Sequence, residues 1–140
     1  MVNPPTAENE RRSGPPGPLE VALRDRSLGH QFLLDVLVLD PHPGWRAGEP
    51  AMGSIRRVLT AVREQRASRR VVIDLSHVAS LTAEGAATLA DQAVKLAAAG
   101  GTLRLTQVRP AVLEAIRQSR LNRVAKIYPD VEEAVLARWD

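Results

Sequence analysis

The chain has 140 residues, a length that suits one globular domain, with 44% hydrophobic and 25% charged residues. It contains no cysteine, which excludes a disulfide framework and any thiolate metal site or nucleophile. No apolar run approaches the roughly 20 residues that a membrane-spanning helix needs, and the first residues lack the layout of a secretory signal. We therefore expect a cytoplasmic protein that does not insert into membranes.

Residues 1–18 hold five of the ten prolines and almost nothing to bury. Such a segment cannot offset the entropy lost on ordering, so the sequence predicts a disordered tail over 1–18 and one domain over 19–140.

The net charge is only +3, but the stretch from Gly53 to Arg70 contains six arginines (56, 57, 63, 66, 69 and 70) and only one acidic residue. This indicates a solvated basic surface or a site for an acidic partner. Few aromatic residues and no DNA-binding spacing argue against nucleic acid.

In the first half of the domain, the alternation of apolar and polar residues is weak. Residues 19–24 suit a half-buried strand, and residues 33–39 form a nearly continuous apolar run, as a more central strand would. The turn-forming stretch 40–44 ends this run, and a loop is expected to about residue 52. An amphipathic helix follows, with Ser54 as its N-cap and an apolar stripe made by Ile55, Val58, Leu59 and Val62.

The second half gives clearer signals. Residues 71–75 predict a central strand, and residues 82–99 predict an alanine-rich helix that Gly100-Gly101 ends. A strand over 102–106, a helix opened by Pro110, a short strand over 124–127 and a last helix opened by Pro129 complete the chain. This order predicts an α/β domain with a largely parallel sheet.

Several stretches in the second half resemble the STAS domain family, which includes antagonists of anti-sigma factors. They are VVIDLSHV at 71–78, LTAEG at 81–85, GGTLRL at 100–105, SRL at 119–121 and YPDVEEA at 128–134. The resemblance extends weakly back to residue 19. It implies a STAS-like α/β fold, a mixed, mostly parallel sheet of four to five strands with about four helices packed on it. It also implies a protein that binds an anti-sigma factor, often a serine kinase. In that family, phosphorylation at the turn before the second helix switches off binding.

That turn departs from the family's phosphorylatable pattern, which is close to Asp-Ser-Ser-Gly with the acceptor just before the glycine. Stressosome-type relatives carry their acceptor directly after the Asp. Anchored on Gly85, the chain has Thr82, Ala83 and Glu84 at the first three positions, so both acceptor positions, 83 and 84, lack a hydroxyl. Three interpretations stay open. Glu84 is a fixed charge that imitates phosphate, Thr82 is a new acceptor, or Thr82 only caps the helix while Glu84 favours its dipole.

We expect the partner, an anti-sigma factor or related serine kinase, to dock on this turn and on the first exposed positions of the helix, with the basic helix at its rim. The predicted contact residues are Ser80, Leu81, Thr82, Ala83, Glu84, Gly85, Thr88 and Asp91. Gly85 either leaves a patch open to a partner's backbone or packs closely on the sheet. The alternative function is a non-switching subunit of a larger assembly, such as a stressosome-like shell or a lipid-transport complex. The sequence also allows a homodimer.

The residue pattern argues against catalysis and against any cofactor or metal. Ser76 and His77 are neighbours at a strand end, so their side chains diverge. His30, His42 and His77 lack metal-ligand spacing, and neither common nucleotide-binding glycine motif is present. Asp74 ends the central strand, and we expect its carboxylate to accept a hydrogen bond from the loop that follows.

Overall fold

The computed structural model describes residues 17–26, 28–42, 49–65 and 69–139. The tail predicted over 1–18 lies outside these residues, except for Gly17 and Pro18. Part of the loop predicted after residue 44 and one of the six arginines, Arg66, also lie outside them.

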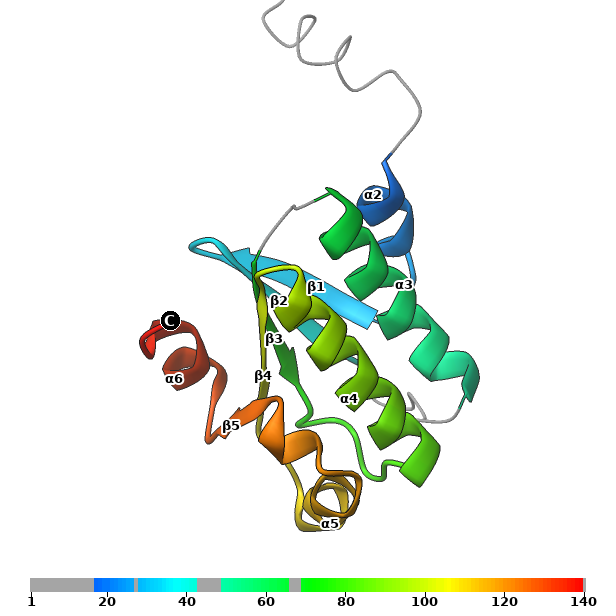
Figure 1. Ribbon diagram of the computed structural model, residues 1–140, viewed down its shortest axis with the longest axis vertical. Helices are drawn as coiled ribbons and strands as arrows, with labels where there is room; N and C mark the ends of the chain where they lie inside the picture. Colours follow the sequence, from blue (N-terminus) through cyan, green and yellow to red (C-terminus); the bar gives the residue numbers. More distant parts are fainter. Residues whose placement is uncertain (1–16, 27, 43–48, 66–68, 140) are drawn as a thin grey trace, which may run out of the picture.

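Five strands form one mixed sheet in the order β1-β2-β3-β4-β5. Their bounds are Leu28–Leu33 for β1, Val36–Pro41 for β2, Arg70–Asp74 for β3, Thr102–Thr106 for β4 and Lys126–Tyr128 for β5. The first two strands are antiparallel, and every later pair is parallel. The predicted fold class, a mixed and mostly parallel sheet in an α/β domain, is therefore confirmed (Figure 1).

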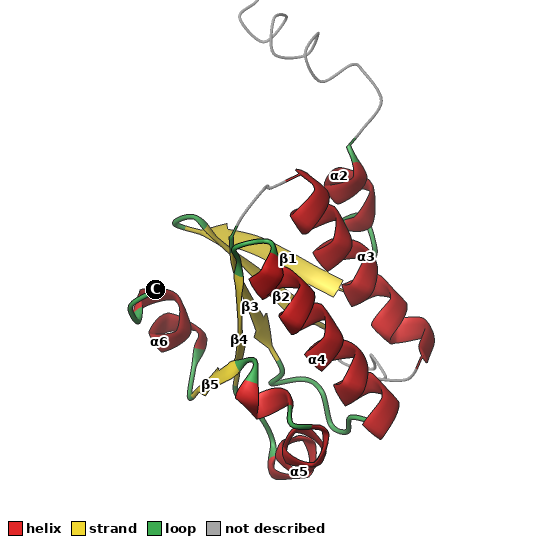
Figure 2. Cartoon of the chain, viewed as in Figure 1, coloured by secondary structure: helices red, strands yellow, loops and turns green. Residues whose placement is uncertain are grey.

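Helices cover both faces of this sheet (Figure 2). They are α2 (Pro18–Ala22), α3 (Glu49–Gln65), α4 (Ala83–Ala98), α5 (Pro110–Ser119) and α6 (Val131–Leu136), with a 3-10 turn η1 at Leu121–Arg123. The main apolar core lies between the sheet and the layer formed by α2, α3, α4 and α5. A second, smaller core lies under α6 on the opposite face.

The strand β2 shows why the central strands read as continuous apolar runs. Leu37 and Leu39 join the main core, whereas Val36 and Val38 join the core under α6. Because alternate side chains point to opposite faces and both faces are covered, every position in the run favours an apolar residue.

Two elements in the first half differ from the prediction. Residues 19–24 do not form a strand, because Pro18 opens the short helix α2, whose Leu19 and Ala22 are buried on one side. The run 33–39 is not one strand either. It contains the turn of a β1–β2 hairpin, with Leu34 in the left-handed region at φ 58°.

Two predicted helix starts are also wrong. The helix α3 begins at Glu49, so Ser54 lies inside it, and the Ser54 hydroxyl donates to the Asp25 carboxylate instead of capping. The last helix begins at Val131 and is capped by Asp130, whose side chain accepts from the N–H of Glu133. In both cases a residue type that often starts helices lies close to the helix start but does not mark it.

The strand over 71–75, the helix over 82–99 and the strand over 102–106 lie where the sequence predicts them, within one residue. Pro110 opens α5 as expected. Gly100 ends α4 with φ at 87°, a left-handed conformation that glycine adopts without a steric penalty.

Candidate docking site

The loop between β3 and α4 is held in place from the inside. Val78 is fully buried and Leu81 is 7% exposed, so both anchor the loop in the main core. As predicted, Asp74 accepts a hydrogen bond through Oδ1 from the N–H of Ser76, at 3.0 Å. The N–H of Val78 donates to the carbonyl oxygen of Leu75, also at 3.0 Å. These contacts fix the position at which α4 begins.

The helix α4 begins where Thr82 caps it. The Oγ1 of Thr82 accepts a hydrogen bond from the N–H of Gly85 at 2.9 Å, and its carbonyl oxygen accepts from the N–H of Ala86 at 2.9 Å. A helix start leaves four N–H groups without partners inside the helix. The Thr82 side chain satisfies one of them, so the first turn of α4 keeps a partial positive charge at the surface.

The carboxylate of Glu84 lies in this first turn. Ser80, Thr82, Ala83 and Glu84 are all exposed, and we call these four residues the α4 corner. None of the ion pairs found within the described segments involves Glu84. Its negative charge therefore faces solvent beside the positive end of a 16-residue helix, where it is favoured.

Not every predicted contact residue has a side chain that a partner could reach. Leu81 and Gly85 are buried, and Thr88 is half-buried. Asp91 is exposed, but its carboxylate pairs with the Lys95 ammonium at 3.0 Å, one helical turn on. Of the two interpretations of Gly85, burial favours close packing, because a partner's backbone cannot reach a covered residue.

Sequence reasoning missed the neighbouring loop between β4 and α5. Arg109 donates through Nε to the carbonyl oxygen of Ser76 at 3.0 Å, and this contact ties the two loops together. Gln107 in the same loop is exposed, with φ at 54°. The signal that could have found them is the parallel sheet, because loops that follow neighbouring parallel strands meet at one edge.

Three arginines of the basic stretch between Gly53 and Arg70 make contacts within the domain, two of them on α3 and one on β3. Arg63 donates through Nη1 to Oε1 of the buried Gln92 at 2.6 Å, which links α3 to α4. Arg57 pairs with Asp25 at 3.5 Å, and Arg70 pairs with Asp35 at 3.2 Å. These contacts favour the interpretation of a solvated surface over that of a dedicated site for an acidic partner.

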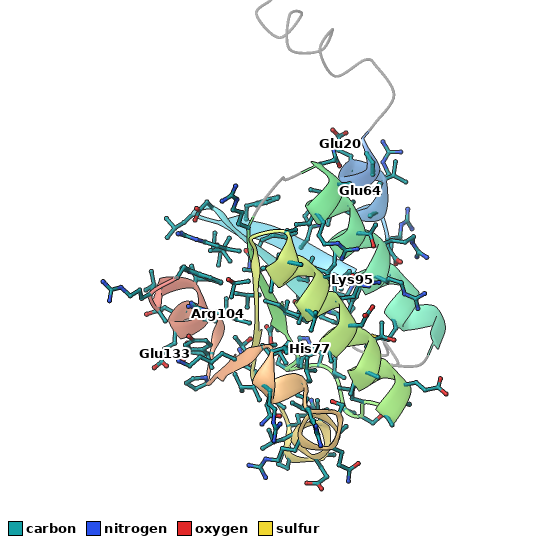
Figure 3. All side chains as sticks on the ribbon, viewed as in Figure 1. Glu20, Glu64, His77, Lys95, Arg104 and Glu133 are labelled. Carbon is teal, nitrogen blue, oxygen red and sulfur yellow. The ribbon has the colours of Figure 1, made fainter. Side chains whose placement is uncertain are left out.

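The histidines do not form a metal centre. Among the described residues, no group of three or more His, Cys, Asp or Glu side chains is placed to hold a metal ion. His77, labelled in Figure 3, has its Nδ1 3.6 Å from Oδ1 of Asp40 and is 47% exposed. The backbone of its neighbour Ser76 is fixed by Asp74 and Arg109, as described above.

The model of the family described as STAS domain matches residues 51–134, which is more than half of the chain. The chain belongs to the STAS domain family. The match spans this domain from α3 to α6, so it includes the whole α4 corner. No curated protein sequence matches the chain. In the described residues, no helix is both long and apolar enough to cross a bilayer.

Solved structures share the fold of this STAS domain. An anti-sigma factor antagonist from Mycobacterium paratuberculosis is 23% identical, with a TM-score of 0.67 over 79% of this chain and 91% of that one. A variant of RsbS from Moorella thermoacetica, in which glutamate replaces a serine, is 16% identical, with a TM-score of 0.66 over 79% and 92%. The phosphorylated form of SpoIIAA from Bacillus is 16% identical, with a TM-score of 0.61 over 77% and 96%.

Proposed function

We propose that this STAS domain is a non-catalytic regulatory module that binds a protein partner, an anti-sigma factor or a related serine kinase, through the α4 corner. In this proposal Glu84 takes the place of the usual phosphoacceptor serine. The observation that carries it is the exposed carboxylate of Glu84 in the first turn of α4, next to a cap made by Thr82. Similarity in fold to anti-sigma factor antagonists supports the class of partner.

The charge at this position sets the direction of the effect. A phosphate group carries about 1.5 to 2 negative charges at neutral pH, and a carboxylate carries about one. Glu84 therefore imitates the phosphorylated state in part and permanently. Because phosphorylation weakens partner binding in the family that the chain resembles, the carboxylate holds the domain in a weaker-binding state. Removing the charge should strengthen binding.

The test begins with affinity capture from an extract of the protein's own cells, with the bound proteins identified by mass spectrometry. Capture of a kinase-fold or sigma-regulatory protein supports the proposal, and its failure to appear contradicts the proposal. Titration calorimetry then compares the wild type with Glu84→Ser, Glu84→Ala and Glu84→Gln. Glu132→Gln, on the exposed surface of α6 across the sheet, is the matched control.

The three variants separate the interpretations of the turn. Tighter binding by Glu84→Ala and Glu84→Gln, with Glu132→Gln unchanged, supports the imitation of phosphate. Equal binding by the wild type and the three Glu84 variants excludes the imitation of phosphate and leaves Glu84 as a helix-stabilising residue. Incubation with the captured kinase and ATP, followed by mass spectrometry of Thr82→Val and the wild type, tests whether Thr82 accepts phosphate.

A second candidate function is a non-switching subunit of a larger assembly. The observation that favours it is the pair of exposed apolar side chains, Phe32 and Leu34, at the turn of the β1–β2 hairpin. This turn lies at the opposite end of the strands from the loop that leads into the α4 corner. Light scattering separates the two functions. A large homo-oligomer supports the assembly, whereas a small species that captures a soluble partner supports the first proposal.

A further inference from the structure

The outer edge of β1 has no partner strand in the segments that the structure describes, because β1 is first in the sheet order and pairs only with β2. The hairpin loop of two residues closes on the pair Leu33–Val36, and Leu28 lies opposite Pro41, which has no N–H to donate. Hydrogen-bonded pairs alternate along an antiparallel ladder, so residues 29, 31 and 33 bond to β2. The N–H and C=O groups of residues 30 and 32 therefore point outward and are open, whereas the N–H of Leu28 already donates to the carbonyl oxygen of Asp25 at 3.3 Å.

This edge lacks the features that usually block strand pairing. Its sequence, LGHQFL, contains no charged residue and no proline, and its six consecutive pairs with β2 leave no room for a bulge. The opposite edge strand, β5, has only three residues, begins with Lys126 and is followed by Pro129. One edge of the sheet is protected, and the other remains able to accept a strand.

Apolar side chains gather at the end of the same edge. Phe32 is 50% exposed and Leu34 is 80% exposed. Leu34 also holds a left-handed backbone conformation, with φ at 58°, which is unfavourable for leucine. The tip of the β1–β2 hairpin points away from α2, α3 and α4 (Figure 1). An exposed apolar side chain on a strained backbone, next to an open strand edge, indicates a contact surface.

We infer that β1 pairs antiparallel with β1 of a second copy of this chain, about a two-fold axis, so that the two sheets become continuous. A strand that meets its own copy in this way presents the same outward spacing on both sides, so the N–H and C=O groups match. The absence of charge on β1 means that the two copies meet without like-charge repulsion. The dimer covers Phe32 and Leu34.

The size of this surface sets the expected affinity. Stable complexes bury about 1,200–2,000 Å² in total, and two strands of six residues provide less than that. We therefore expect a reversible dimer with a dissociation constant between about 1 μM and 1 mM. Sedimentation velocity measured over a concentration series up to about 1 mM detects it.

Cysteine cross-linking tests the geometry, because the chain has no cysteine of its own. His30→Cys, Gln31→Cys and Phe32→Cys each place a thiol on the two-fold axis of one of the three registers with the greatest overlap. Facing Cα atoms in an antiparallel ladder lie about 4.5–5.5 Å apart, within the range that a disulfide spans. We expect one of the three to oxidise to a covalent dimer, whereas Ala97→Cys, exposed on α4, stays monomeric.

Substitutions test the energetics of the same surface. Phe32→Lys and Leu34→Asn should each raise the dimer dissociation constant about tenfold or more, while Val94→Lys on the exposed side of α4 leaves it unchanged. Asparagine tolerates the left-handed conformation, so Leu34→Asn keeps the test valid if Phe32→Lys unfolds the domain. A monomer at every concentration, or a dimer unaffected by both substitutions, overturns the inference. Equal cross-linking of Ala97→Cys also overturns it.

Discussion

The guanidinium carbon of Arg104 lies 3.6 Å from the centroid of the Trp139 ring. Arg104 is only 5% exposed and projects from β4 toward α6 (Figure 3). Its Nη1 donates to the carbonyl oxygens of Ala134 at 2.8 Å and Ala137 at 2.9 Å, and its Nη2 donates to that of Arg138. These carbonyls lie at and beyond the C-terminal end of α6, where a helix carries partial negative charge. The Arg104 guanidinium thus connects α6 to the sheet.

Replacing Arg104 should therefore loosen α6. We expect Arg104→Met to lower the free energy of unfolding by about 2–4 kcal/mol, because buried carbonyls lose their donors. Arg104→Lys should restore only part of the loss, since an ammonium cannot stack on Trp139 and reach several carbonyls at once. Urea denaturation measures both, with Arg117→Met on the exposed side of α5 as the control. Full stability in Arg104→Lys would show that charge alone is sufficient.

The cap at the start of α4 should contribute measurably to stability. Thr82→Ala removes the acceptor of the Gly85 N–H and should cost about 1 kcal/mol, whereas Thr82→Ser keeps the hydroxyl and should cost little. Urea denaturation gives the free energies, and amide hydrogen exchange at Gly85 reports the local opening. Slow exchange at Gly85 in Thr82→Ala would contradict the role of the cap.

The charge of Glu84 should stabilise the domain in a salt-dependent way. Glu84→Gln should cost about 0.3–1 kcal/mol at low ionic strength, and less as salt screens the helix dipole. The matched change Glu64→Gln lies near the C-terminal end of α3, where a negative charge is unfavourable, so it should cost nothing or stabilise. Thermal unfolding at low and high salt compares the two variants. Similar losses at both sites would exclude the dipole as the cause.

The two glycines after α4 should respond to alanine for different reasons. A Cβ at Gly100 would meet nothing within 4 Å, but the φ of 87° means that Gly100→Ala should cost about 1 kcal/mol in backbone strain. A Cβ at Gly101 would lie 2.6 Å from Cδ1 of Leu96 and 3.0 Å from the carbonyl oxygen of Arg69. Gly101→Ala should therefore cost about 1–3 kcal/mol through overpacking. A milder effect at Gly101 than at Gly100, in urea denaturation, would indicate a looser contact with Leu96 and Arg69.

The second half of the fold could be predicted because its signals are local and strong. Gly100 and Pro110 mark boundaries through backbone preferences that do not depend on the rest of the chain. The first half lacks such markers. The hairpin turn places Leu34 where glycine or asparagine is usual, so nothing in the sequence separates β1 from β2. Residues 19–24 fit a strand and a helix equally well, and only Pro18, at the first position of α2, favours the helix.

Some features of the candidate site could likewise be predicted from the sequence, and others could not. Capping by Thr82 is a contact within three residues, so the sequence alone predicts it. The burial of Leu81 and Gly85 depends on how α4 packs, which no local pattern specifies. The contact between Arg109 and the carbonyl oxygen of Ser76 joins residues 33 positions apart and follows only from the order of the strands.

The anchoring of the β3–α4 loop by Val78 and Leu81 bears on the kinetics of recognition. In the proposed function, a partner that meets the α4 corner finds this loop already ordered, so association loses little entropy in ordering it. Encounter rates among related complexes vary far less than their lifetimes do. Exchanging the side chain at position 84 should therefore change the residence time of the partner more than its rate of arrival.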